Sequence, residues 1–387
     1  MRKARIAFYC HNTYGLGHVV RSLTIAEAVV ARGAECKVIT GCRHIERLRI
    51  PRWVDVHRLD PVEMDAVGRP LPAADDPDKS NITARRSNQI LKFCLAWRPD
   101  CIVVDHHPLG LAGELVDTLL CARLANMRAV WGVPYPEDMP LKPYHNPRLR
   151  RSLGRYQHLL AYSDKTFDDI LESWNPALLP RQVDYVGVVT NRVAAKHARG
   201  KSIVALCGGG YGSDPFHKLV LAATARFGHS LRIVAGPQSQ TDTMRQHRTG
   251  RQFELVPPLP VEDALEDAAI VISRAGYNTA FHLVQTNLPV IFIPRKLLND
   301  DQPRRADKLA QLQNIWSVDE SHTEAPTLLE SALAAGLDPT IGLADRRCQI
   351  DLNGASRAAE CILSALPIPD TDFSGSSSRR LPADGWL

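Results

Sequence analysis

Residues 272–282 read ISRAGYNTAFH and follow an apolar run that begins at Ala268. A second apolar run covers residues 288–294, and the polar residues Asp300, Asp301 and Gln302 come shortly after it. A buried strand, a polar glycine turn, a helix and a second buried strand are typical of an α/β sheet. In such sheets ligands bind at the carboxyl ends of the strands, where helix N-termini offer free N–H groups to anions. The stretch therefore predicts a site for a phosphorylated ligand.

The composition is that of a soluble globular protein. The chain has 387 residues, of which 44% are hydrophobic and 23% are charged, and this length suffices for two ordinary domains. No segment approaches the roughly 18–20 apolar residues that span a bilayer. The N-terminus, MRKAR, leads into a short strand-like run without a signal-peptide pattern, so we expect a cytoplasmic location.

Neither cysteine spacing nor net charge indicates a metal or a nucleic acid. The nine cysteines are isolated in the sequence, and we expect most to be buried, reduced thiols rather than metal ligands. A net charge of +5 is too small to indicate nucleic-acid binding. A basic cluster between Lys142 and Arg155 is most simply a solvated face; contact with an anionic substrate or a lipid surface stays open, and membrane association is not indicated.

Apolar runs alternate with helical patterns along almost the whole chain, which predicts a parallel, doubly wound α/β sheet. The pattern restarts at residue 203, so we expect two Rossmann-like units. The expected divisions are a first domain 1–190, a linker 191–200, a second domain 201–367 and a disordered tail 368–387. The expected strands are 5–10, 36–40, 101–105, 184–189, 203–207 and 231–235; the expected helices are 19–32, 114–125, one from about 215, and 355–366; residues 60–80 are expected to form a long loop.

The first glycine loop, GLGHVVR, lies between the first strand and the first helix at residues 15–21. It lacks the third glycine of the dinucleotide fingerprint, and the second strand ends at Gly41 without a ribose-binding acid, so a dehydrogenase is disfavoured. The turn is expected to bring His18 to the mouth of a cleft. There His18 is either a locally hydrogen-bonded helix residue or a general base, and a helix N-terminus favours the neutral imidazole.

The second glycine loop, CGGGYGS, occupies residues 207–213 after the first strand of the second unit. Four glycines within five residues let the backbone approach a ligand closely, although an ordinary flexible turn is the alternative. The loop lacks the Gly-Lys-Ser/Thr ending of a P-loop, so an ATPase is disfavoured.

Together these motifs resemble those of the GT-B glycosyltransferases. GLGHxxR, the mid-chain GGGxG and the segment SRAGxxT…LPxxxxP…DQxxxA are nearest to the branch of the muramyl-peptide N-acetylglucosaminyltransferase MurG. The resemblance spans roughly residues 5–365 and is most specific over 272–306. It implies two Rossmann-like domains facing a cleft, with a nucleotide-sugar donor on the C-terminal domain and an unidentified small-molecule or glycan acceptor on the other. It further implies inverting, metal-independent transfer without a cofactor, most often from a uridine diphosphate sugar.

The resemblance also assigns donor-binding roles. The diphosphate would lie at the helix opening near Gly276, with Asn278 and Thr279 as hydrogen-bond donors. Asp301 and Gln302 would bind the sugar, and Asp301 is also a candidate helix N-cap. Arg192 would reach the diphosphate from the linker, and Leu259 would lie at the nucleobase. Ser213 would replace a hydroxyl residue that is absent at Gly210, and His282 stands where the family has a ribose-binding glutamate. The other implied donor-binding residues are Gly17, Gly209, Gly210 and Arg274.

For the chemistry, His18 is the first candidate for the base that deprotonates the acceptor. Asp105 and His106 end a neighbouring strand on the same rim and are second candidates, unless they only cap the turn. GxGHxxR also resembles the hydrolase acting in pseudaminic acid synthesis, so a nucleotide-sugar hydrolase is the alternative function. A non-catalytic nucleotide-sugar-binding protein is the third.

Overall fold

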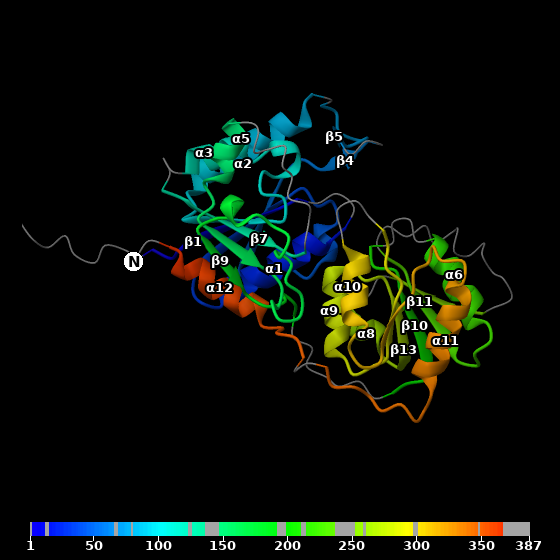
Figure 1. Ribbon diagram of the computed structural model, residues 1–387. Helices are drawn as coiled ribbons and strands as arrows, with labels where there is room; N and C mark the ends of the chain where they lie inside the picture. Colours follow the sequence, from blue (N-terminus) through cyan, green and yellow to red (C-terminus); the bar gives the residue numbers. More distant parts are fainter. Residues whose placement is uncertain are drawn as a thin grey trace, which may run out of the picture.

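Two parallel β-sheets form the centres of two lobes, one from each half of the chain (Figure 1). In this computed structural model the described residues are 2–11, 15–65, 69–78, 80–122, 126–135, 147–191, 199–209, 214–236, 252–257, 261–296, 301–346 and 349–366. Helices cover both faces of each sheet, as the alternation of apolar runs and helical patterns predicts. The predicted α/β class with parallel sheets is confirmed.

The first sheet has seven strands in the order β3-β2-β1-β6-β7-β8-β9, and every pairing in it is parallel. β1 pairs with both β2 and β6, so the strand order reverses at β1. Such a reversal leaves a crevice at the carboxyl ends of the two strands beside it. The strands are β1 (Arg5–Cys10), β2 (Glu35–Thr40), β3 (Val54–Arg58), β6 (Cys101–Asp105), β7 (Arg128–Val133), β8 (His158–Ala161) and β9 (Gln182–Tyr185).

The second sheet repeats this plan with six parallel strands in the order β12-β11-β10-β13-β14-β15. Its reversal lies at β10, which pairs with β11 and β13. The strands are β10 (Ser202–Leu206), β11 (Ser230–Val234), β12 (Glu254–Val256), β13 (Ala268–Ser273), β14 (Val290–Phe292) and β15 (Ile315–Ser317).

Helices follow most strands, and several begin at residues suited to that position. Asn81 caps α2 by accepting a hydrogen bond from the Ala84 N–H at 3.1 Å. The α-helices are α1 (Gly17–Val30), α2 (Ile82–Trp97), α3 (Val116–Ala122), α5 (Pro147–Leu153), α6 (Asp214–Thr224), α8 (Val261–Ala264), α9 (Tyr277–Gln285), α10 (Gln302–Leu309), α11 (Ala325–Leu337) and α12 (Gly354–Ser364); the short 3-10 helices are η1 (Ile45–Arg47), η2 (Leu111–Gly113) and η3 (Pro176–Leu178).

The apolar core runs through both lobes. One cluster lies on the α2 and α3 face of the first sheet, and a second lies on the α6 and α11 face of the other. The third is continuous from α1 to α9 and α12 and contains Val19, Phe281 and Ala359. In Figure 1, α9 and α10 occupy the side of the second lobe that faces the first lobe. The two carboxyl-end crevices therefore open toward one another.

The last helix, α12, returns to the first lobe and lies along α1 (Figure 1). Its Ala358, Ala359 and Ile362 are fully buried, and the preceding chain hydrogen-bonds to Val188 at 2.7 and 3.0 Å. The expected second domain, 201–367, included this helix, but its apolar face complements the first lobe instead. The other expected domain limits stay a prediction, and the tail 368–387 lies outside the described residues.

Two further expectations about secondary structure are wrong. The strand expected at 184–189 is β9, which ends at Tyr185, and Val188 bonds to Asp351 rather than to the sheet. The loop expected at 60–80 contains an antiparallel pair, β4 (Val62–Met64) and β5 (Pro70–Pro72). Prolines within this short pair hide its strand character in the sequence.

Among the described residues, no helix has both the length and the hydrophobicity needed to cross a bilayer. The eight described cysteines are free thiols, and six of them are buried.

Candidate active site

His18 and Asp105 meet at the crevice of the first sheet. His18 lies in the first turn of α1, and Asp105 is the last residue of β6. His18 Nδ1 is 2.5 Å from Asp105 Oδ2. An ionised carboxylate only accepts hydrogen bonds, so Nδ1 is the donor to Asp105 and Nε2 is the ring atom able to accept a proton. The His18 side chain is 18% exposed, whereas the Asp105 side chain is 4% exposed.

Arg21, one turn further along α1, holds the Asp105 carboxylate from the other side. Its Nε donates to Oδ1 at 2.9 Å and its Nη2 to Oδ2 at 2.6 Å. The Arg21 side chain is 1% exposed, and its Cζ lies 5.0 Å from the centre of the Tyr277 ring. Burial alone would raise the pKa of Asp105, but the Arg21 guanidinium and the His18 hydrogen bond hold it below its ordinary value. Asp105 is therefore an anion that orients His18.

Three more histidines surround this pair. The ring centre of His11 lies 4.2 Å from that of His18 and 4.5 Å from that of His107. The His106 and His107 rings lie 4.3 Å apart. Burial, and then the neighbouring imidazoles, hold the pKa values of His11 and His106 well below the usual range. Burial and His18 lower the pKa of His107 to about 4, against a smaller opposing effect of Asp105.

These depressed pKa values predict acid sensitivity. As pH falls from about 6.5 to 4, the unfolded chain gains a proton at His107 that the folded chain does not bind, so stability falls across that window. The loss from His107 alone is expected to reach about 3 kcal/mol. His107→Gln should flatten the pH dependence of the urea unfolding free energy, while His44→Gln, outside the cluster, should keep the wild-type dependence. If the unfolding free energy changed equally steeply with pH in His107→Gln and in the wild type, this prediction would be contradicted.

The structure does not support His106 as an alternative base. Its side chain is 2% exposed and its backbone has a positive φ of 68°. Its Nε2 lies 3.2 Å from the Tyr135 hydroxyl, and its carbonyl accepts from Trp131 Nε1 at 2.6 Å. His106 thus belongs to the buried support of the site, whereas the His18 side chain is 18% exposed.

Glycines leave open space at the crevice of the second sheet. Gly208 follows β10 with a φ of +63°, which favours glycine, and a Cβ there would meet no atom within 4 Å. Gly276 is the N-cap residue of α9, and a Cβ there would also meet nothing within 4 Å. Gly209 lies beside Gly208 and is partly exposed. The first turn of α9 leaves backbone N–H groups without acceptors in the helix, as an anion site requires.

The two crevices touch through α9. Asn278 Nδ2 donates to the Gly17 carbonyl of the first glycine loop at 3.0 Å. The Tyr277 hydroxyl donates to the Tyr162 carbonyl at 2.6 Å and accepts from the Val189 N–H at 2.9 Å. The Asn278 amide is thus engaged with the first lobe in this structure, and its role as a donor to a diphosphate stays a prediction. Thr279 lies in the same turn and is partly exposed.

Two residues predicted to bind the sugar donor are buried and contact other protein groups. Arg274 is 6% exposed; its Nη1 donates to the Ile293 carbonyl at 3.1 Å and pairs with Glu320 at 2.9 Å. His282 is 7% exposed, and its Nδ1 lies 3.7 Å from a carboxylate oxygen of Glu262. The Glu262 carboxylate, from α8, thus lies beside His282, a contact that the sequence did not indicate.

Asp301 and Gln302 open α10 near the same cleft. Asp301 is the N-cap residue, as one alternative proposed, and accepts from the Arg304 N–H at 3.3 Å. Gln302 Oε1 accepts from the Arg295 N–H at 3.2 Å and so supports the preceding loop. Asp301 also lines a hollow between the lobes together with Tyr135, Tyr162, Tyr277 and Arg304. Contact of Asp301 with the donor sugar stays a prediction.

Four predicted donor-binding residues, Arg192, Gly210, Ser213 and Leu259, lie outside the described residues, as does Lys142 of the basic cluster. Conversely, the predicted site residues did not include Arg21, His11 or Tyr277. The signal for Arg21 was present, since it is the last residue of the GLGHxxR motif.

Comparison with known families identifies the second lobe. Residues 203–360 match the family model described as "Glycosyltransferase family 28 C-terminal domain". This region, most of which lies in the second lobe, is similar to a glycosyltransferase family 28 C-terminal domain. This domain begins within β10 and contains both the Gly208 turn and the N-terminus of α9. No curated protein sequence matches the chain significantly.

Solved structures extend the similarity to both lobes. The glycotransferase of kitacinnamycin superposes with a TM-score of 0.64 at 17% identity, over 95% of this chain and 100% of that one. MurG of Acinetobacter baumannii gives 0.60 at 14% identity, over 93% and 99%. The spinosyn rhamnosyltransferase SpnG, complexed with thymidine diphosphate, gives 0.58 at 17% identity, over 93% and 100%. The chain has the GT-B fold, and the predicted resemblance to GT-B glycosyltransferases, MurG included, is confirmed.

With the family 28 domain and the GT-B fold together, the expectation of an enzyme of the glycosyltransferase class is also confirmed. The roles of the individual site residues stay predictions.

Proposed function

We propose that this protein transfers a sugar from a nucleoside-diphosphate donor to an acceptor hydroxyl by a single inverting displacement. The observation that carries the proposal is the His18–Asp105 pair, with 2.5 Å between Nδ1 and Oδ2, placed where α1 meets the N-terminus of α9. One lobe thereby contributes a base and the other an anion-binding turn. The family 28 domain of the second lobe supports a nucleotide-sugar donor.

In the proposed step, His18 Nε2 takes the proton of the acceptor hydroxyl as its oxygen bonds to the anomeric carbon. The bond from that carbon to the diphosphate oxygen breaks, and the nucleoside diphosphate leaves with the electron pair. Attack opposite the leaving group inverts the anomeric configuration. Asp105 stabilises the imidazolium that forms, and Arg21 keeps Asp105 in place.

The departing charge is expected to develop against the first turn of α9. A helix N-terminus stabilises an anion by about 0.3–1 kcal/mol, and by up to about 2 kcal/mol when partly buried. The Gly208 turn and Gly276 provide the open approach, and Asp301 is suited to the donor sugar. We propose that these groups suffice without a metal ion or cofactor, and that Asn278 releases Gly17 when the donor binds.

Binding of nucleoside diphosphates provides the first test. A diphosphate at one hundred times its dissociation constant should stabilise the chain by about 2.7 kcal/mol. Gly276→Asp should abolish the thermal shift, because it adds a carboxylate to the open space at the α9 N-terminus. Gly228→Asp is the matched control, since a Cβ there also meets no atom within 4 Å. Equal shifts in both variants would place the diphosphate elsewhere.

The same panel identifies the nucleotide. Thymidine diphosphate occupies the similar SpnG, whereas the resemblance to the MurG branch implies uridine diphosphate as the commonest carrier. The nucleotide with the largest shift is then assayed as its sugar conjugate with and without acceptors. Consumption that depends on the acceptor supports transfer; equal release of free sugar without an acceptor would instead indicate a hydrolase.

A further inference from the structure

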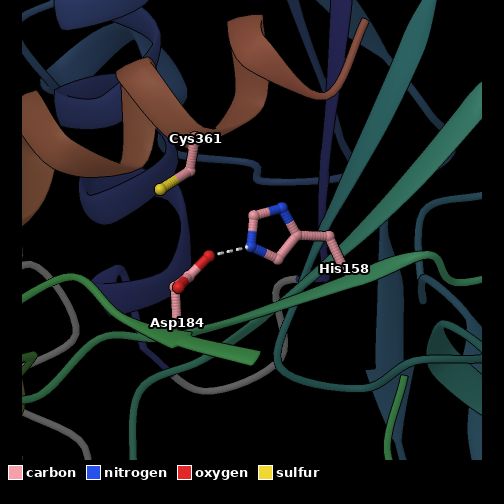
Figure 2. Close-up of side chains that lie close together, drawn as sticks. All are labelled: His158, Asp184 and Cys361. Atoms are coloured by element: carbon pink, nitrogen blue, oxygen red, sulfur yellow. Dashed lines mark hydrogen bonds and ion pairs between the residues drawn. The ribbon is translucent and has the colours of Figure 1, made fainter. Parts of the chain in front are cut away.

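His158, Asp184 and Cys361 come together from three elements that are distant in the sequence (Figure 2). His158 Nε2 lies 2.6 Å from Asp184 Oδ2. One potential metal-binding atom of each residue lies within 4.8 Å of the other two. Figure 2 shows the Cys361 side chain extending from α12 and the Asp184 carboxylate directed at the imidazole.

Sheet register explains this meeting. His158 pairs with Gln182 across β8 and β9, and Asp184 is two residues beyond Gln182. Residues two apart on a strand share a face, so His158 and Asp184 are diagonal neighbours on one face of the sheet. α12 packs against that face, with Cys361 at the edge of its apolar stripe. The arrangement thus depends on the return of α12 to the first lobe.

The three side chains of the proposed site differ in their exposure to solvent. His158 is 1% exposed, whereas the Asp184 side chain keeps 42% of its exposure. Cys361 is a free thiol that is partly buried. A site with this exposure leaves an open side for solvent.

Imidazole nitrogen, carboxylate oxygen and thiolate sulfur are the three protein ligand types of zinc. Zinc with three protein ligands takes water as its fourth, and the ligand atoms stand about 2.0–2.3 Å from the metal. In tetrahedral geometry the ligand atoms are then about 3.3–3.8 Å apart. His158 Nε2 and Asp184 Oδ2, which are 2.6 Å apart, would separate by about 0.7 Å to reach that spacing.

We propose that His158, Asp184 and Cys361 form a transition-metal site, zinc being the best match, that fastens α12 to the edge of the first sheet. The site lies apart from His18: His158 begins β8, whereas His18 lies at the carboxyl ends of the strands. Its role is structural, since it joins the last helix of the chain to β8 and β9.

The proposed site is expected to bind zinc with moderate affinity. His158 Nδ1 is buried and has no hydrogen-bond partner among the described residues. Zinc-binding histidines usually donate their second N–H to a neighbouring acceptor, and loss of that support typically weakens binding about 10–100-fold. We therefore expect weaker binding than at a closed four-ligand site.

Cobalt(II) titration of the metal-stripped full chain tests the proposal. We expect a saturable thiolate-to-cobalt charge-transfer absorption with one equivalent per chain, which zinc then displaces. Cys361→Ser should remove the absorption, and Asp184→Asn should weaken binding at least tenfold. Cys121→Ser is the matched control, because Cys121 is also a partly buried free thiol in a helix; it should bind cobalt like the wild type.

Thermal unfolding provides an independent readout. Zinc should raise the Tm of the wild type and of Cys121→Ser, but not that of Cys361→Ser. Circular dichroism without metal verifies that all three chains are folded. The absence of a thiolate absorption in the wild type, or its persistence in Cys361→Ser, would overturn the proposal and leave His158 and Asp184 as a hydrogen-bonded pair only.

Discussion

Replacing His18 with alanine is expected to lower kcat for sugar transfer by about 10²–10⁴-fold, the contribution typical of a general base. The His18 side chain is 18% exposed, and its Nδ1 is occupied by Asp105, which leaves Nε2 to accept the proton. The substitution removes no fully buried group, so the protein should stay folded. Steady-state kinetics with the donor identified by thermal shift provide the measurement.

The controls separate catalysis from folding and donor binding. His18→Ala should keep the thermal shift caused by the nucleoside diphosphate, because that ligand is proposed to bind the second lobe. His44→Ala, a partly buried histidine away from the site, should keep kcat within about twofold. A His18→Ala variant with nearly wild-type kcat would exclude this residue as the base.

The second large effect concerns Arg21. Arg21→Met should destabilise the protein by about 3–5 kcal/mol, because removing one partner of a buried ion pair leaves the other charge uncompensated. Asp105 is 3% exposed and receives two hydrogen bonds from Arg21. Without them, the Asp105 carboxyl gains a proton more readily and loses its hold on His18. The free energy of unfolding measured in urea and the kcat for sugar transfer should therefore both fall.

Arg32, two residues beyond the end of the same helix, supplies the matched control. It pairs with Glu360 at 2.7 Å, but the two side chains keep 30% and 61% of their exposure. Exposed pairs of this kind contribute about 0–1 kcal/mol. Arg32→Met should therefore change stability little. If Arg21→Met costs no more than Arg32→Met, the buried pair does not support the site as described.

Features with a local physical signature were predictable from the sequence. Continuous apolar runs gave β1 and β6 with the observed bounds, because strands covered on both faces need apolar residues at every position. The meeting of His18 with Asp105 followed from topology, since parallel strands end on one rim. The opening of α9 near Tyr277 followed from the glycine before it.

Features decided by tertiary contact were not predictable. Arg274 stands in the most specific motif, yet Glu320, from a distant segment, pairs with it in the interior. Asn278 was expected to face a ligand, but it reaches the carbonyl of Gly17 in the other lobe. The return of α12 depends on the fit between its apolar face and α1, for which its sequence alone specifies no partner.

The central claim is that a diphosphate binds the N-terminus of α9 opposite His18. A crystal structure with a non-hydrolysable nucleotide sugar tests it most directly. We expect phosphate oxygens about 2.7–3.2 Å from backbone nitrogens of the first α9 turn, with Asn278 released from Gly17 and the anomeric carbon on the His18 side. A nucleotide bound elsewhere, with the Asn278–Gly17 hydrogen bond intact and His18 remote from the sugar, would contradict it.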